Sequence, residues 1–214
     1  MTGFASPVVV RYWGLCDYAD IFQRMQIFNQ TRQHDTADEI WLLQHHPVFT
    51  LGLNGKAEHV LDAGNIPLIK TDRGGQVTYH GPGQLIVYIL LDVRRNGLGI
   101  RDIVTRLECS VIHYLASENI VAVARKDAPG VYVQGQKIAA LGLRVKSGSC
   151  YHGLSLNVNM DLTPFTRINP CGYAGMEVTS LQRLGLQISV EQVTSALLKN
   201  IQYQFGIEQV SSHE

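Results

Sequence analysis

The sequence lacks the local patterns that mark most metal and nucleotide sites. It has no HExxH segment, no two cysteines at CxxC spacing, no GxGxxG fingerprint and no glycine-rich loop ending in Gly-Lys-Ser or Gly-Lys-Thr. His45 and His46 are neighbours, which is a poor geometry for joint ligation of a metal from a strand. We therefore expect neither a metal ion nor a nucleotide cofactor.

Long apolar runs and an excess of charge of either sign are also missing. The chain has 18 Lys and Arg against 18 Asp and Glu, so no overall field attracts nucleic acid or a membrane surface. No apolar run approaches the roughly 20 residues that cross a bilayer. Residues Met1–Pro7 have neither the basic nor the apolar part of a secretion signal, so we expect a cytoplasmic protein whose four scattered cysteines are free thiols.

Length and hydrophobic patterns predict one domain over residues 1–214, of the α/β or α+β class, with a β-sheet and flanking helices. Apolar runs at 40–43 and 85–91 predict buried strands. Residues 131–145 read as a hairpin with a Gln-Gly turn. Apolar and polar residues alternate over 154–160, which predicts a strand with one buried face.

Three helices are expected around this sheet. Apolar residues recur at helical spacing from Tyr18 to Phe28 and from Ile103 to Leu115. Before the last helix, Ser189 and Gln192 have the spacing of a capping box. Strands followed and flanked by helices in this way indicate a layered sheet-and-helix architecture.

The most unusual stretch is RGGQVTYHGPGQLIVYILLD at 73–92. Its four glycines precede an apolar strand, and each glycine gives up backbone entropy on folding without adding core contact. Glycines grouped in this way let a backbone bend sharply or let another molecule lie against it. His80 and His152 each precede a glycine in such a segment. We interpret 73–92 as one wall of a binding site.

A candidate nucleophile is Cys171, in the turn Pro170-Cys171-Gly172. Proline fixes its own φ and glycine lets the chain turn at once, a combination that holds a thiol outward on a stiff loop. The alternative is an inert cysteine in a turn. Cys16, Cys109 and Cys150 lie in less unusual surroundings, so we expect structural or incidental roles for them.

Lys137 is the best candidate base. The period of two along a strand places it on the same face as Ala139, Leu141 and Leu143, an apolar face that suits an ammonium poorly. One interpretation is a lysine at a strand start whose ammonium reaches water. The other is a lysine held inside, where loss of water suits it to proton exchange.

Four segments together resemble the bacterial lipoyl(octanoyl) transferases. They are RGGQVTYHGPGQL at 73–85, GQKIAALGLRV at 135–145, HGLSLNVNMDL at 152–162 and INPCGYAGMEVTSL at 168–181. The resemblance runs from about Trp13 to the C-terminal helix, and the segments stand in the order of the family. It implies the fold of the biotin and lipoate protein ligase catalytic domains, a mixed sheet flanked by helices around an acyl tunnel.

The resemblance also implies roles for particular residues. Cys171 corresponds to the acyl-thioester nucleophile, and Lys137 to the partner that lowers the pKa of the thiol and transfers protons. The acyl-binding segments of the family correspond to Arg73, Gly74, Gly75, Gln76, Val77, Thr78, Tyr79, His80, Ala140, Leu141, Gly142, Gly153, Leu154 and Ser155. The glycines among them are expected to leave room for an aliphatic chain.

The implied activity is the first step of lipoate cofactor synthesis. An octanoyl group moves from octanoyl-acyl carrier protein to a lysine of lipoyl domains, in the E2 subunits of 2-oxoacid dehydrogenases and in the glycine cleavage H protein. Exchange of one thioester for another is nearly balanced in free energy, so we expect no ATP, no metal and no other cofactor. Neither nucleic acid nor a membrane is an expected partner.

Two rival functions fit parts of the same sequence. An ATP-dependent lipoate or biotin ligase of this fold activates its acid as an adenylate and needs no cysteine. A non-catalytic module would bind acyl groups or lipoyl domains without chemistry. The presence of both Lys137 and Cys171 argues against each of these rivals.

Overall fold

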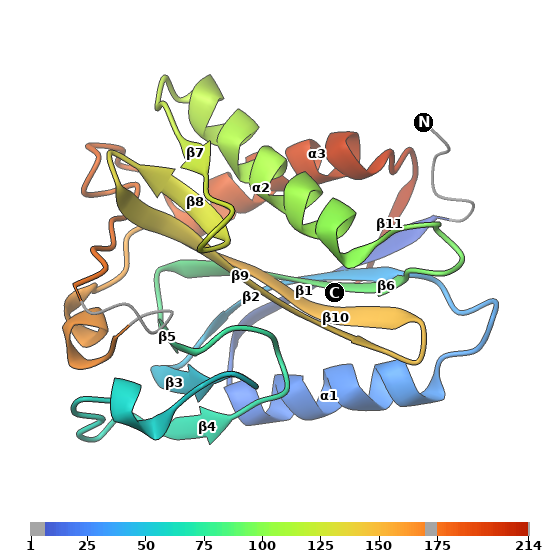
Figure 1. Ribbon diagram of the computed structural model, residues 1–214. Helices are drawn as coiled ribbons and strands as arrows, with labels where there is room; N and C mark the ends of the chain where they lie inside the picture. The colour runs from blue at the N-terminus through green and yellow to red at the C-terminus, as the bar shows by residue number, and fades with distance from the viewer. Residues whose placement is uncertain (1–6, 170–174, 214) are drawn as a thin grey trace.

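An eight-stranded mixed sheet forms the centre of the fold (Figure 1). The computed structural model describes residues 7–169 and 175–213. The strands are, in chain order, β1 (Val8–Cys16), β2 (Glu39–His45), β3 (Val48–Leu51), β4 (Leu68–Lys70), β5 (Val77–His80), β6 (Gln84–Asp92), β7 (Val123–Ala124), β8 (Gly130–Val133), β9 (Gln136–Lys146), β10 (Ser149–Asn157) and β11 (Val210–His213). The helices are α1 (Tyr18–Thr31), α2 (Ile100–Ser117) and α3 (Val190–Phe205), with short 3-10 helices η1 (Ala57–His59) and η2 (Thr163–Arg167).

The strands divide into a large and a small sheet. The large sheet has the order β11-β1-β2-β6-β10-β9-β8-β7, in which β1 runs parallel to β11 and β2 and all other neighbours are antiparallel. The small sheet has the order β4-β3-β5. The large sheet is thus mixed, as the resemblance implies. The small sheet is mixed as well, because β3 runs parallel to β4 and antiparallel to β5, and it was not predicted.

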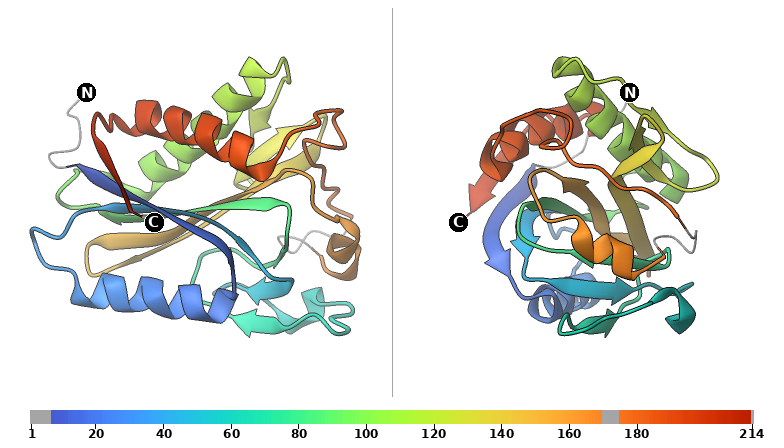
Figure 2. Two further views of the ribbon diagram at one scale, coloured as in Figure 1. Left: turned by 180° about the vertical axis from the view of Figure 1, so that it is seen from behind. Right: turned by 90° about the vertical axis from the view of Figure 1, so that its left-hand side faces the viewer.

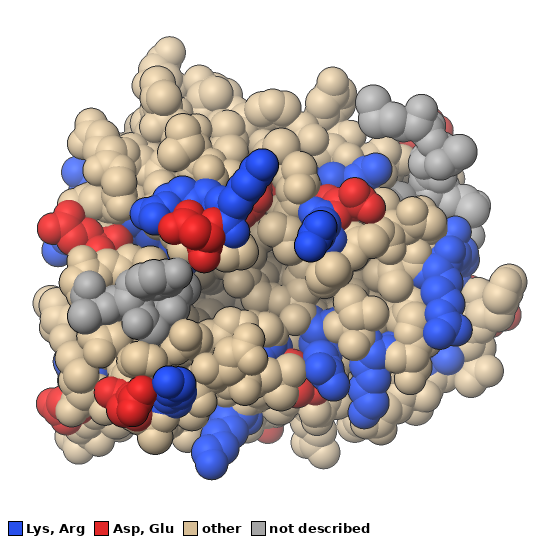
Figure 3. All heavy atoms as spheres, in the orientation of Figure 1, with Lys and Arg blue, Asp and Glu red and all other residues tan. Residues whose placement is uncertain are grey.

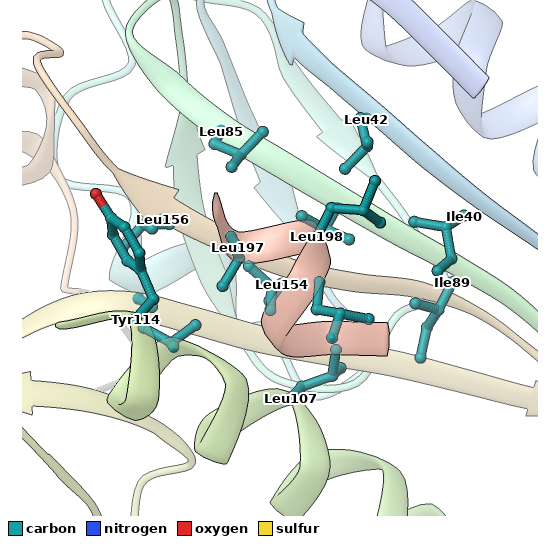
Figure 4. Packing of buried hydrophobic residues seen from close by; sticks show 14 of the residues in the cluster. Ile40, Leu42, Leu85, Ile89, Leu107, Tyr114, Leu154, Leu156, Leu197 and Leu198 are labelled. Atoms are coloured by element: carbon teal, nitrogen blue, oxygen red, sulfur yellow. The ribbon is translucent and has the colours of Figure 1, made fainter. Parts of the chain in front are cut away.

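Helices cover both faces of the large sheet. α2 and α3 lie on one face, and α1 and the small sheet lie on the other (Figures 1 and 2). The larger core lies beneath α2 and α3, where Leu154 and Leu156 of β10 meet Leu107 of α2 and Leu197 of α3 (Figure 4). A second cluster joins α1 to the opposite face of the same strands. Both faces of the central strands are therefore buried.

The main elements confirm the sequence predictions, with one correction. The three predicted helices are present, and the capping box forms, with Ser189 N donating to Gln192 Oε1 at 3.0 Å. The expectation of a single buried face over 154–160 was wrong for β10, because Ser155 and Asn157 are also buried. The second face is covered because α1 and the small sheet pack there. Of the helices described, none is long and apolar enough to cross a membrane.

Candidate active site

A narrow pocket lies between β5, β9 and β10, on the face of the large sheet that α1 covers. Its cavity volume is about 50 Å³. Figure 3 shows a hollow on this side of the molecule, with Lys and Arg side chains above and below it and Asp and Glu among them. The lining residues are Tyr18, Arg73, Gly75, Gln76, Val77, Thr78, His80, Ile86, Tyr88, Ala140, Leu141, Gly142, His152, Gly153, Leu154 and Ser155.

The three segments predicted to bind an acyl group meet at this pocket. All of their residues line it except Gly74 and Tyr79. Gly74 instead donates its backbone N–H to Leu143 O at 2.9 Å, which fastens the loop before β5 to β9. The Tyr79 ring packs between Phe49 and Phe165 in the core of the small sheet.

Sequence reasoning missed some of the lining residues. Ile86 and Tyr88 belong to an apolar run without periodicity, which hides the face that each residue takes. Tyr18 reads only as a core residue of a helix. The glycine that follows His152 indicated that this residue lies at a site of close approach, whereas nothing in the sequence indicated a role for its neighbour Asp72. Ile86 and Tyr88 lie within the stretch 73–92 that was interpreted as a wall, but none of the four pocket residues was named individually as a binding residue.

Two pocket glycines are explained by backbone packing rather than by room for a ligand. A Cβ atom on Gly153 would lie 2.1 Å from the carbonyl oxygen of Val87 on the neighbouring strand. A Cβ atom on Gly142 would lie 3.0 Å from the carbonyl oxygen of Gly74. The protein's own backbone approaches both positions, so the need for glycine there does not depend on an aliphatic chain, and the expected contact with such a chain stays a prediction.

The buried side chain of Arg73 stabilises the pocket wall by hydrogen bonds. Its Nη2 atom donates to Thr50 O at 2.7 Å and to Gln76 O at 2.7 Å, and Nε donates to Thr50 Oγ1 at 3.2 Å. These bonds join β3 to the loop before β5. Arg73 thus shapes the wall through contacts within the protein.

A chain of buried hydrogen bonds leads from His80 to the segment beside Lys137. His80 Nδ1 is 2.7 Å from Gln84 Oε1, and Gln84 Nε2 donates to Asn157 Oδ1 at 2.9 Å. Asn157 Nδ2 then donates to Thr179 O at 2.9 Å. Because Gln84 uses its amide as donor to Asn157, its oxygen accepts and His80 Nδ1 carries the proton. Burial lowers the pKa of His80 well below its usual value, so the ring is neutral.

A bulge in β9 places Lys137 on the pocket face. Val131 pairs with Ala139, but the next residue of β8, Tyr132, pairs with Lys137, so the register skips Ile138. Directly paired residues share a face, and consecutive residues do not. The expected position of Lys137 on the face of Ala139 was therefore wrong, and the bulge is the reason.

Lys137 is held inside the protein. Its side chain is only 4% exposed, with Nζ 3.3 Å from Pro129 O and 5.2 Å from the centroid of the Tyr132 ring. Glu108 lies close by and accepts a hydrogen bond from Gly130 N at 2.9 Å. Burial raises the pKa of Glu108, although that hydrogen bond and the charge of Lys137 oppose the rise. The interpretation of a lysine that reaches water is excluded.

The backbone of Lys137 also binds the chain just after the predicted nucleophile. Lys137 N donates to Glu177 O at 2.9 Å, and Thr179 N donates to Lys137 O at 3.0 Å. The nucleophile itself, Cys171, lies outside the described residues. Its role stays a prediction, while the described part of its loop is bonded to the lysine predicted to assist it.

The structure separates two of the other thiols from this site. Burial raises the pKa of Cys150 to about 12, and Cys150 belongs to the core beneath α2 and α3. Burial also raises the pKa of Cys16, which donates to Trp13 O at 3.0 Å. Thiolate is the reactive form of cysteine, so neither thiol is suited to nucleophilic attack.

The fold is similar to those of ligases that modify proteins. Lipoate-protein ligase A bound with ATP has a TM-score of 0.75 at 15% sequence identity, over 100% of this chain and 90% of that one. The biotin protein ligase of Aquifex aeolicus in complex with biotin and ATP has a TM-score of 0.57 at 14% identity, over 94% and 71%. These similarities define the class of fold.

Sequence comparison is more specific. Residues 17–202 match the family described as the lipoyl protein ligase A/B catalytic domain. The octanoyltransferase of Vibrio vulnificus (strain YJ016) is 53% identical over 205 residues, which cover 96% of this chain and 94% of that protein. The octanoyltransferase of Stutzerimonas stutzeri (strain A1501) is 56% identical over 202 residues, which cover 94% and 92%. The chain belongs to the octanoyltransferases, a family of acyltransferases with the lipoyl ligase fold.

Proposed function

We propose that the chain moves an octanoyl group from octanoyl-acyl carrier protein to a lysine of a lipoyl domain through a thioester on Cys171. The observation that carries the proposal is the position of Lys137. It is buried on the pocket face, and its backbone is bonded to both Glu177 and Thr179, which follow Cys171 in the chain. A buried amine beside a loop that bears a cysteine suits thiol activation.

The first half of the reaction forms the thioester. Lys137 takes the proton of Cys171, and the thiolate attacks the thioester carbonyl of the donor. The bond to the pantetheine sulfur breaks, and Lys137 returns the proton to that leaving sulfur. Because one thioester replaces another, the step needs neither ATP nor a metal ion.

The second half forms an amide. The acceptor lysine attacks the thioester carbon as a neutral amine, after it has lost one proton to solvent. Lys137 takes up the second proton, from the nitrogen of the tetrahedral adduct, as the Cys171 thiolate leaves. The octanoyl chain lies meanwhile in the pocket between β5, β9 and β10. The residues proposed to contact it are the lining residues of the three segments at 73–80, 140–142 and 153–155.

The proposed acceptors are lipoyl domains of 2-oxoacid dehydrogenases and the glycine cleavage H protein, in the cytoplasm. The chain's octanoyltransferase relatives and the lipoyl ligase fold support an acceptor of this kind. ATP-dependent ligation remains the main rival, since two structures of similar fold were solved with ATP. The absence of an ATP requirement is therefore part of what must be tested.

Intact-mass measurement tests the proposal directly. Incubation with octanoyl-acyl carrier protein, without ATP, is expected to add one octanoyl group, which peptide mapping assigns to Cys171. Addition of a lipoyl domain should then remove the adduct and octanoylate the domain. A Cys171→Ala variant serves as the control and should gain no adduct. Transfer that depends on added ATP, or an adduct on another residue, would refute the thioester route.

A further inference from the structure

One peptide group joins Lys137 to a buried carboxylate on α2. Lys137 Nζ donates to Pro129 O at 3.3 Å, and Gly130 N donates to Glu108 Oε1 at 2.9 Å. The carbonyl of Pro129 and the N–H of Gly130 belong to the same trans peptide group, in which they point in opposite directions. The ammonium of Lys137 and the carboxylate of Glu108 therefore bind opposite sides of one planar group.

Glu108 is an unusual residue for its place in the helix. α2 contacts β8 and β9 (Figure 1), and Glu108 is one of the buried residues of this helix, as are Leu107 and Val111. It is only 9% exposed. Burial of a carboxylate is costly unless hydrogen bonds and an opposite charge compensate for the lost water. The hydrogen bond from Gly130 and the charge of Lys137 supply this compensation.

Gly130 permits the close packing of this arrangement. Its φ is +146°, a value that other residues rarely adopt. A Cβ atom at this position would lie 2.7 Å from Ala139 O and 3.1 Å from Lys137 Cε. The side chain of Lys137 thus packs directly against the backbone that Glu108 binds from the other side.

The other charged and titratable groups beside this pair lie on both sides of it. The groove on the outer side of Glu108 is lined by exposed cationic side chains, those of Arg101, Arg125 and Lys126. On the inner side, the Tyr132 ring lies 5.2 Å from Lys137 Nζ, and the exposed residue Glu177 accepts a hydrogen bond from the backbone of Lys137. Water screens the charges of the exposed groups, whereas the Glu108 carboxylate acts on Lys137 through the interior of the protein.

We propose that Glu108 is a positioning residue for octanoyl transfer, which fixes the ammonium of Lys137 and favours its protonated form through the peptide between Pro129 and Gly130. The proposal rests on the proposed function, in which Lys137 activates Cys171. A carboxylate at the N–H and an ammonium at the carbonyl polarise the peptide in the same sense, so each strengthens the hydrogen bond of the other. The proton of Cys171 is then transferred more readily to Lys137, and a larger fraction of the thiol is thiolate at a given pH.

The direction of this effect distinguishes it from direct repulsion. When it acts through Lys137, the charge of Glu108 increases the thiolate fraction of Cys171. A negative charge that acted directly on Cys171 would instead oppose thiolate formation. Removal of the charge therefore shifts the alkylation of Cys171 to higher pH in the first case and to lower pH in the second.

Two substitutions separate the charge of Glu108 from its hydrogen bond. Glu108→Gln keeps an oxygen that accepts from Gly130 N but carries no charge, whereas Glu108→Ala removes both. Asp127→Asn is the matched control, because Asp127 is an exposed carboxylate of the loop that leads to Gly130 and pairs with Arg125 at 2.6 Å. The measurement is the pH profile of iodoacetamide alkylation at Cys171, and thermal unfolding shows that each variant is folded.

Glu108→Gln is expected to shift this profile to higher pH by about 0.5 to 1 unit, which is less than the shift associated with a charge in direct contact. At a pH below the pKa of the thiol, the alkylation rate then falls about three- to tenfold. Glu108→Ala should shift the profile at least as far, and Asp127→Asn should leave it within about 0.2 unit of wild type. A wild-type profile in Glu108→Gln, a shift to lower pH, or an equal shift in Asp127→Asn would overturn the proposal.

Lys137→Ala distinguishes failure of this proposal from failure of the proposed function. If Lys137→Ala shifts the alkylation profile and Glu108→Gln does not, only the role of Glu108 is wrong. If neither variant shifts the profile, thiol activation by Lys137 is wrong as well. In the double variant of Lys137→Ala and Glu108→Gln, the profile should move no further to higher pH than in Lys137→Ala alone, because Glu108 acts through Lys137. A further shift to higher pH in the double variant would contradict this route.

Discussion

Lys137 pairs with Tyr132 across β8 and β9, with its ammonium 5.2 Å from the centroid of the ring. The pair lies on the pocket face only because the register skips Ile138. The face of an aromatic ring attracts a cation, and the attraction strengthens where water is excluded. Tyr132 therefore helps to keep the lysine inside, beside the segment that follows Cys171.

Substitution of Lys137 should impair both halves of the reaction. Lys137→Ala is expected to slow octanoyl transfer by about a hundredfold or more, the usual size of a lost acid-base group. Lys137→Arg should not restore turnover, because a guanidinium keeps its proton near neutral pH. The rates of thioester formation and of amide formation, measured separately by mass spectrometry, check both statements. Normal turnover in Lys137→Arg would exclude proton transfer by this residue.

Alkylation of the cysteine tests the second role of Lys137. An unperturbed thiol titrates near ~8.5, and a nearby cation lowers that value. The pH profile of Cys171 alkylation by iodoacetamide should therefore be shifted in Lys137→Ala, so that the rate increases only at a higher pH than in the wild type. Lys137→Arg should retain part of the wild-type profile, since it keeps the charge. Identical profiles in wild type and Lys137→Ala would exclude thiol activation.

The four cysteines should respond differently to substitution. Cys171→Ser is expected to abolish transfer, because a hydroxyl is a far weaker nucleophile than a thiolate. Ser or Ala in place of Cys16, Cys109 or Cys150 should keep most of the activity, although Cys150→Ser is expected to lower stability, since it puts a hydroxyl into an apolar core. Transfer rates and urea unfolding of the single variants check this. An active Cys171→Ser enzyme would contradict the assignment.

The composition of the pocket wall could be predicted from sequence, whereas the direction of key side chains could not. The glycine-rich and His-Gly segments can be recognised in the sequence by their residue types, and the structure brings them together at the pocket. Lys137 was assigned to the wrong face because one skipped residue reverses the period of two, and nothing in the sequence marks that bulge. His152 also departs from the alternation of side chains along a strand, because its backbone has a positive φ. Both departures from regular strand geometry occur in the site.

Gly153→Ala should destabilise the fold rather than narrow the pocket. The added Cβ atom would lie 2.1 Å from Val87 O, and a backbone oxygen in a central strand cannot move aside. We expect a loss of about 3 kcal/mol in urea unfolding, the upper end of the usual range for overpacked sites. Gly14→Ala is the matched control. Its φ of +65° strains any side chain, but nothing lies within 4 Å, so the expected loss is about 1–2 kcal/mol. Equal losses would mean that the close approach at Gly153 is unimportant.

Stability should fall as the pH falls from 6.5 toward 4, in part through His45. His45 Nδ1 lies 3.0 Å from Cys16 O and Nε2 lies 2.8 Å from Tyr88 Oη, so the neutral ring satisfies both groups. Burial lowers the pKa of His45 from 6.5 to about 4. Between these values the unfolded chain binds a proton that the folded chain does not. The contribution of His45 is therefore complete above about pH 6.5 and is lost as the pH falls, levelling off below about pH 4.

A variant without a titratable side chain at position 45 isolates the contribution of His45 to this pH dependence. His45→Gln cannot bind the proton, while His80 and His152, whose pKa values are also lowered by burial, remain in both proteins. Between pH 7 and pH 5, wild type should lose on the order of 2 kcal/mol more of its unfolding free energy than His45→Gln. Urea denaturation at both pH values measures the difference. Equal losses of unfolding free energy in the two proteins would show that His45 has the same pKa in the folded and unfolded chain. The burial of its ring beside Tyr88 would then make no contribution to the pH dependence of stability.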